Sequence, residues 1–130
     1  MRRAVLANQI LLVTHLAFCL LLLGTWQRNN SGPDAPSPAD VGFAAAQTLA
    51  VCLLVVVLSA VATVLLSRRP RTGVVLSGCA WLAVLAEAQV LRGHGVGAAW
   101  TAPVAVVAIG GMALCVLTLV ASGAHRAHLV

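Results

Sequence analysis

The sequence predicts an all-α, polytopic membrane protein: a single domain of four transmembrane helices with both termini on the cytoplasmic side. Of its 130 residues, 61% are hydrophobic and only 8% are charged, whereas soluble domains carry about 25% charged residues. Four apolar runs approach the roughly 20 residues that a bilayer-spanning helix needs. They cover 4–24, 43–66, 73–91 and 103–121. Because these runs use most of the chain, we expect no separate soluble domain.

The first run, 4–24, follows two arginines at the N-terminus, where a signal peptide would also lie. It is longer than the roughly 7–15 residues of a signal-peptide core, and no clear small-residue cleavage site follows. We therefore expect an uncleaved first helix.

The segment 25–42 is the longest polar stretch and holds three of the five prolines and both Asp residues. Because proline cannot donate a backbone N–H, we expect an irregular outer loop here. Asn29-Asn30-Ser31 matches the glycosylation sequon, so Asn29 is a candidate acceptor if the source is a secreting eukaryote.

The later connections are short. The second and third runs are joined by "SRRPRTG", in which Pro70 and Gly73 predict a tight turn and an antiparallel helical hairpin. The second outer loop, "RGHGVGAAWTAP", ends at Pro103. We expect Pro103 in the first turn of the fourth helix, where its missing N–H has no intrahelical partner anyway.

The arginines predict the orientation, because basic residues concentrate in cytoplasmic loops. If four helices alternate, Arg28 and Arg92 lie on one side and the other six on the opposite, cytoplasmic side. Trp26 and Trp100 then lie at the outer interface, where amphipathic rings are favoured. Since the net charge of +5 comes from these scattered arginines, we predict no nucleic-acid partner. The six are Arg2, Arg3, Arg68, Arg69, Arg71 and Arg126.

Glu87 is the only Glu and the only acidic residue inside an apolar run. At 1.5 Å per residue it lies about 6 Å from the end of its run at Leu91, and Gln47 has a similar depth in the second run. We therefore expect a polar rim in which Glu87 leans toward water or bonds Gln47 or Arg92. Acids within membranes are often functional because burying charge is costly, but this shallow position favours a helix-orienting role over ion coupling.

His15 lies near the middle of the first run, and Cys19 follows one turn later on the same helical face. Such a pair would begin a metal or haem site, but no second helix-borne His supplies a further ligand. We predict instead an interhelical hydrogen bond from His15 to a Ser, a Thr or a backbone carbonyl. Each run carries one Cys, at depths too different to meet at one zinc ion, so we interpret all four as packing residues. They are Cys19, Cys52, Cys79 and Cys115.

The sequence contains no Ser/His/acid set, phosphate-binding loop, C-x-x-C motif or paired carboxylates. It therefore predicts a non-enzymatic protein with no catalytic residue, metal or cofactor. Small residues that allow close helix packing are present, and they would serve the bundle first and a membrane partner second. They are Ala60, Gly78, Gly110 and Gly111.

The first helix, "THLAFCLLLLGTWQR" at 14–28, resembles that of the transmembrane protein 107 family, small four-helix ciliary proteins. The family has a His-Leu pair, an aliphatic run, then Trp and a basic residue. The longer first outer loop, the tight inner turn, a Glu near the outer end of helix three and a Trp before helix four are similar too. The family is aromatic-rich around helix three, where this chain is not. The matching residues are His15, Leu16, Trp26, Glu87 and Trp100.

The resemblance implies a non-enzymatic scaffold of the ciliary transition zone, which helps to assemble a Meckel-type membrane complex and so controls entry into the cilium. Its partners would be the lipid bilayer and other membrane proteins. Two alternatives stay open. One is a small transporter or ion-coupled subunit built around Glu87 and Gln47; the other is a membrane protein of a GC-rich bacterium, located in the cell membrane.

Overall fold

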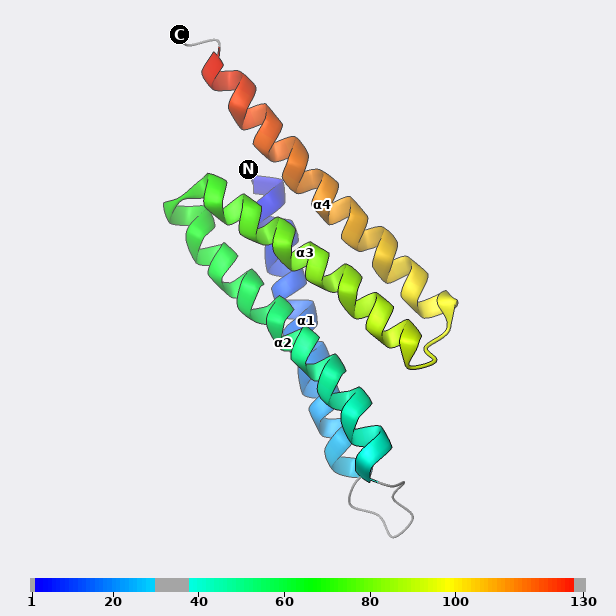
Figure 1. Ribbon diagram of the computed structural model, residues 1–130. Helices are drawn as coiled ribbons and strands as arrows, with labels where there is room; N and C mark the ends of the chain where they lie inside the picture. The colour runs from blue at the N-terminus through cyan, green and yellow to red at the C-terminus, as the bar shows by residue number, and fades with distance from the viewer. Residues whose placement is uncertain (1, 30–37, 128–130) are drawn as a thin grey trace.

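The computed structural model describes residues 2–29 and 38–127, with side chains described at 2–24 and 45–122. The chain forms four helices: α1 Arg2–Asn29, α2 Pro38–Arg68, α3 Pro70–Gly93 and α4 Ala98–Ala127 (Figure 1). Each contains a segment long and apolar enough to cross a membrane. These segments are Arg2–Gly24, Ala45–Arg68, Pro70–Gly93 and Ala98–Ser122. The predicted class, all-helical with four candidate spans, is confirmed, whereas the side on which the termini lie stays a prediction.

The helices continue beyond the predicted apolar runs. α1 reaches Asn29 and α2 begins at Pro38, so regular helix enters the segment that we expected to be irregular. Proline suits a first helical position because its φ is preset and an N–H has no partner there. α4 begins at Ala98, and Pro103 therefore lies inside it rather than in its first turn. At that position the missing N–H removes one intrahelical hydrogen bond.

α2 and α3 form the predicted antiparallel hairpin, and Arg69 alone separates them. Its backbone is extended, with φ −138° and ψ 78°, as expected for a residue that precedes a proline. α3 therefore starts directly against the last turn of α2. Gly73 permits this approach, because a Cβ there would lie 2.5 Å from the backbone nitrogen of Leu66.

A Schellman motif ends α3. The N–H of Val96 donates to the carbonyl of Leu91 at 3.0 Å, and the N–H of Gly95 donates to the carbonyl of Arg92 at 3.1 Å. Gly95 has φ +85°, a left-handed conformation that glycine adopts without steric cost. This motif reverses the chain and fixes where α4 begins.

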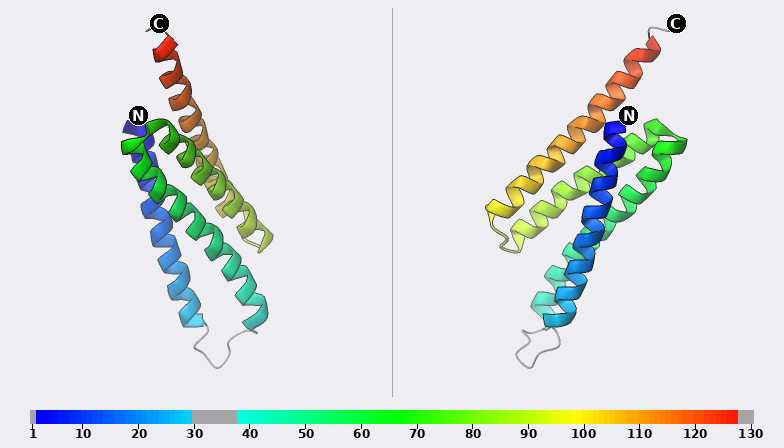
Figure 2. Two further views of the ribbon diagram at one scale, coloured as in Figure 1. Left: turned by 60° about the vertical axis from the view of Figure 1, so that its left-hand side comes forward. Right: turned by 180° about the vertical axis from the view of Figure 1, so that it is seen from behind.

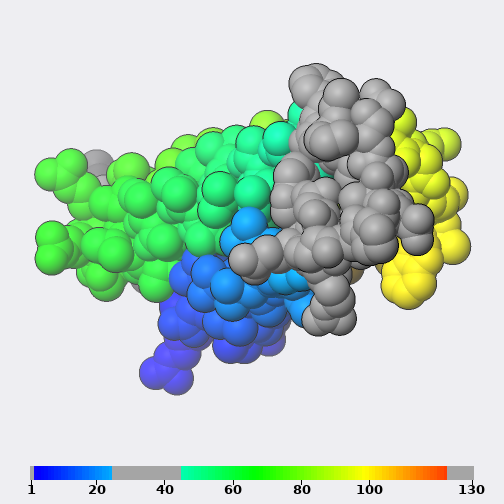
Figure 3. All heavy atoms as spheres, turned by 90° about the horizontal axis from the view of Figure 1, so that it is seen from below, coloured from blue at the N-terminus to red at the C-terminus, as the bar shows by residue number. Residues whose placement is uncertain are grey.

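α2 and α3 form the centre of the bundle, with α1 packed mainly on α2 and α4 mainly on α3. α1 and α4 approach each other near the N-terminus and diverge toward the α3–α4 turn (Figures 1 and 2). In the same views α1 and α2 extend beyond that turn. Figure 3 shows this end of the molecule from below. α1 (blue) lies against α2, and the α3–α4 turn (yellow) is at the right of the view.

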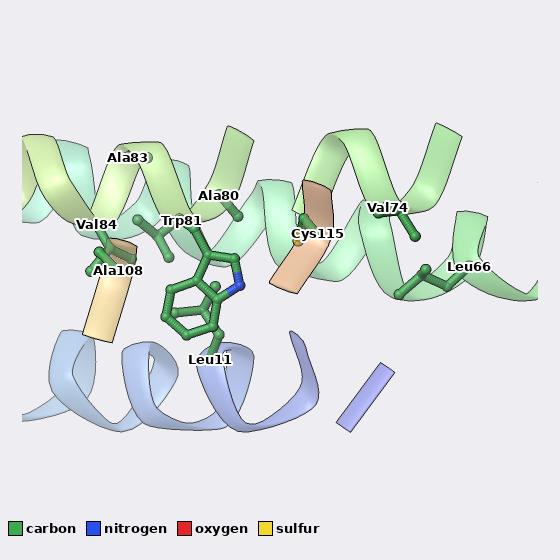
Figure 4. Close-up of a cluster of buried hydrophobic side chains, with 10 residues drawn as sticks. Leu11, Leu66, Val74, Ala80, Trp81, Ala83, Val84, Ala108 and Cys115 are labelled. Carbon is green, nitrogen blue, oxygen red and sulfur yellow. The ribbon is translucent and has the colours of Figure 1, made fainter. Parts of the chain in front are cut away.

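Trp81 is the largest side chain of the buried core. Its indole extends from α3 toward α1, where Leu11 lies against it (Figure 4). Gly111 of α4 also faces this ring, and a Cβ at Gly111 would overlap it. Of the small residues predicted to allow close packing, Gly111 has that role, whereas Ala60 and Gly110 lie on the exposed surface.

Candidate functional site

Polar side chains of α1, α2 and α3 meet inside the bundle. On α1, Asn8 and His15 lie two helical turns apart and share one face. Ser59 of α2 and both Ser77 and Glu87 of α3 are buried opposite them. We call these five residues the polar seam. It is the main polar feature of an otherwise apolar interior.

Asn8 connects three helices. Its amide nitrogen donates to the carbonyl of Ser59 at 2.9 Å and to Oγ1 of Thr63 at 2.8 Å, both on α2. Its amide oxygen accepts from Oγ of Ser77 on α3 at 2.9 Å. The side chain is fully buried, so it replaces all contact with water by contacts with its neighbours. The sequence analysis missed Asn8, although its position two turns before His15 was a usable signal.

His15 bonds Glu87 across the α1–α3 contact. The distance from His15 Nε2 to Glu87 Oε2 is 3.0 Å, and His15 Nδ1 lies 3.1 Å from the carbonyl oxygen of Leu11. The Glu87 side chain is only 3% exposed and that of His15 12%. The interhelical hydrogen bond predicted for His15 is therefore present, but its partner is the carboxyl group rather than a Ser, a Thr or a backbone carbonyl.

Both ring nitrogens of His15 lie against oxygen atoms. A carbonyl oxygen only accepts, so the contact with Leu11 is a hydrogen bond in the tautomer whose hydrogen lies on Nδ1. The contact between Nε2 and Glu87 Oε2 is a hydrogen bond when either atom carries a hydrogen. Such bonds reduce the cost of holding the two polar groups away from water.

Glu87 does not lie in the predicted polar rim. The expected bond to Gln47 or Arg92 is wrong, because Gln47 is exposed and its Oε1 lies 3.0 Å from Nε2 of His94. The reason is the offset between helix ends. Because α1 and α2 extend beyond the α3–α4 turn (Figure 1), a position near the end of α3 lies beside the middle of α1.

A cavity of about 430 Å³ lies beside the pair, and His15 and Glu87 contribute to its wall. Most of the remaining wall is apolar, from Phe18 of α1, Leu91 of α3 and Val104 of α4. Oε1 of Glu87 is buried and has no hydrogen-bond partner among the described residues. The site thus combines an apolar chamber with one unused acceptor.

Of the remaining predicted site residues, Trp100 lines this chamber, and the others lie apart from it or outside the description. Trp100 is 77% exposed and lies near the α3–α4 turn. The side chains of Trp26 and Asn29 fall outside the described residues, as does the rest of the glycosylation sequon. Gln47, paired with His94, is not part of the cavity wall.

The four cysteines occupy different environments. Cys19, Cys52 and Cys115 are buried, as packing residues are, whereas Cys79 is exposed on the outer side of α3. The thiol of Cys52 donates to the carbonyl of His15 at 3.5 Å. Within the described residues, no three His, Cys, Asp or Glu side chains gather as metal ligands would.

These features define a class: a multi-pass, all-helical integral membrane protein with a buried His–Glu pair at the wall of an apolar cavity. No protein-family profile, curated protein or solved structure matches the chain.

Proposed function

We propose that this protein is a non-enzymatic membrane scaffold, a four-helix bundle that assembles with other membrane proteins. The polar seam supports this proposal most directly, because four of its five side chains, all except Ser59, form hydrogen bonds between helices. Asn8 joins α1 to α2 and α3, and His15 joins α1 to α3. The outward surfaces of α1 and α4 are apolar, as at Leu20 and Val116. Such surfaces suit lipid and the helices of a partner.

The resemblance to the transmembrane protein 107 family narrows the proposal to the ciliary transition zone. It rests on the matching residues, two of which, His15 and Glu87, form the buried pair. In a ciliated source the partners would be those of a Meckel-type membrane complex, and the tagged protein would concentrate at the ciliary base.

A small ion-coupled subunit is the second candidate function. One specific observation favours it: Glu87 contributes to the wall of a cavity, and its buried Oε1 has no hydrogen-bond partner among the described residues. Ionisable groups in such positions frequently belong to ion or proton pathways. In this case the carboxyl group itself would be essential, rather than its hydrogen bond to His15.

Two replacements of Glu87 separate these functions. A Gln side chain can donate to Nε2 of neutral His15, so under the scaffold proposal Glu87→Gln should preserve the native complex on a native gel in mild detergent. Glu87→Leu should reduce its recovery, because the hydrogen bond between α1 and α3 is lost and Nε2 of His15 is left unpaired. Neither variant should change proton flux in reconstituted vesicles.

Gln47→Leu is the matched control, since it removes the exposed hydrogen bond between Gln47 and His94. This variant should preserve the complex. A flux driven by a pH gradient in the wild type and lost in Glu87→Gln would establish the ion-coupled subunit instead. Equal recovery of the complex with Glu87→Leu and the wild type would also contradict the scaffold role of the pair.

We further propose that both termini are cytoplasmic. In support, α1 begins beside the arginine-containing α2–α3 turn, at one end of the bundle (Figure 2). Basic residues favour the cytoplasmic side. Reporter fusions at Asp34 and at Arg69 should therefore report opposite sides, with Asp34 outside. The same side for both would refute this topology.

A further inference from the structure

Five arginines gather at one end of the bundle, where α1 begins and α2 turns into α3 (Figure 2). All five side chains are exposed. Three of the four candidate membrane spans have an end here, at Arg2, Arg68 and Pro70. Because the ends of spanning helices lie at the level of the lipid headgroups, these side chains reach that layer. We call this group the arginine cluster: Arg2, Arg3, Arg68, Arg69 and Arg71.

Hydrogen bonds of Asn8 hold three helices together near this end. Asn8 bonds Thr63 of α2 and Ser77 of α3. α1 runs parallel to α3 and antiparallel to α2 (Figure 1). Positions five or six residues farther toward this end of each helix are therefore again level with one another. At 1.5 Å per residue they lie roughly 8–9 Å beyond the Asn8 bonds. These level positions are Arg2, Arg68 and Arg71.

Within the described part of the chain, no carboxylate pairs with the arginine cluster. Glu87, the only acidic residue whose side chain is described, is buried and bonded to His15. Asp40 belongs to the first turn of α2, at the opposite end of that helix from Arg68, and Asp34 precedes that turn in the sequence. The cluster therefore presents five exposed positive charges to an anion.

The position and the number of these charges define the anion. A guanidinium group matches phosphate oxygens in a bidentate geometry. Basic residues at a membrane surface attract anionic lipids by about 1 kcal/mol each. A headgroup with one phosphate engages one or two arginines. A headgroup with several phosphates engages more of the cluster, and each contact after the first is intramolecular.

We propose that the arginine cluster binds a bilayer lipid whose headgroup carries more than one phosphate. The guanidinium groups hold the phosphates, and the acyl chains stay in the bilayer beside the helices. This lipid site is independent of the scaffold function. It is also independent of the side on which the termini lie, because either leaflet presents its headgroups at this level.

The test compares two lipids that differ only in their number of phosphates, phosphatidylinositol bisphosphate and phosphatidylinositol. Saturation binding of each radiolabelled lipid is measured on purified, immobilised protein in mild detergent. The bisphosphate should bind about tenfold more tightly, a difference that corresponds to about 1.4 kcal/mol. Its binding should weaken at high salt, because mobile ions screen exposed charges. Equal affinity for the two lipids, or an affinity that salt does not change, would overturn the proposal.

Two double variants locate the binding. Arg68→Gln with Arg71→Gln should weaken binding of the bisphosphate lipid about tenfold, again about 1.4 kcal/mol. Arg28→Gln with Arg92→Gln removes the same charge from the last turns of α1 and α3, at the opposite end of these helices, and should bind like the wild type. Equal affinities of the two double variants would place the lipid elsewhere. Circular dichroism of each variant shows whether its helices are intact.

A soluble competitor distinguishes a lipid from a free polyphosphate. Inositol trisphosphate carries several phosphates on the same ring without acyl chains, so it gains nothing from the apolar helices below the cluster. It should displace the bisphosphate lipid only at a concentration at least about tenfold higher than unlabelled lipid requires. Displacement at equal concentrations would assign the arginine cluster to a soluble polyphosphate and overturn the lipid site.

Discussion

Gly111→Leu should strongly destabilise the bundle, whereas Gly110→Leu should not lower its stability. Gly111 is buried against the indole of Trp81, and a Cβ there would overlap that ring. Trp81 is itself buried beside Leu11 (Figure 4), so it has little space into which to move. Overpacking of this kind costs roughly 1–3 kcal/mol and occasionally more. We expect about 3 kcal/mol, measured by unfolding in mixed micelles of mild detergent and dodecyl sulfate.

The neighbouring residue makes a matched control. Gly110 is exposed and a Cβ there meets nothing within 4 Å among the described atoms, while both replacements gain the same helix propensity of about 1 kcal/mol. A further variant tests the cause. The double variant Gly111→Ala, Trp81→Leu should lose less stability than the sum of the losses in its two single variants. Equal destabilisation by the two single Gly→Leu variants would show that Trp81 does not determine the effect.

The number and class of the helices were predictable from the sequence, because bilayer-crossing helices need long apolar runs. Their ends were not, since they depend on local backbone chemistry. Pro38 starts α2 inside the segment 25–42, which we expected to be irregular because of its prolines. Gly95 stops α3 through a Schellman motif, after which α4 begins before Pro103. Composition alone does not distinguish a proline that starts a helix from one inside it.

The two residues of the His15–Glu87 pair were predictable from the sequence, but their pairing was not. His15 and Glu87 were each identified as unusual polar residues in apolar runs, yet their depths were counted along separate helices. Such counting assumes that neighbouring helices end at the same level. The structure shows an offset between the helix ends (Figure 1). Glu87 therefore lies beside His15, and Gln47 lies beside His94. The offset arises from packing between helices, which cannot be predicted from the sequence of one helix alone.

Replacing one residue of the His15–Glu87 pair should lower the stability of the bundle more than replacing both. His15→Leu leaves both carboxyl oxygens of Glu87 buried and unpaired, and Glu87→Leu leaves Nε2 of His15 unpaired. Removing one partner of a buried charged pair costs about 3–5 kcal/mol, whereas replacing both by apolar groups is often neutral. We expect each single variant to lower the free energy of unfolding by about 3 kcal/mol. The double variant should lose less than either, because no unpaired polar group remains.

A second cycle, on Gln47 and His94, separates burial from hydrogen bonding itself. Their side chains also lie 3.0 Å apart, but they are exposed, so water can replace each lost partner and the coupling should be close to zero. The buried cycle should instead give a coupling free energy of more than about 3 kcal/mol, beyond the upper end of the usual range for residues in contact. If the losses of the two buried single variants simply add in the double variant, His15 and Glu87 act independently. The pair would then not hold α1 against α3.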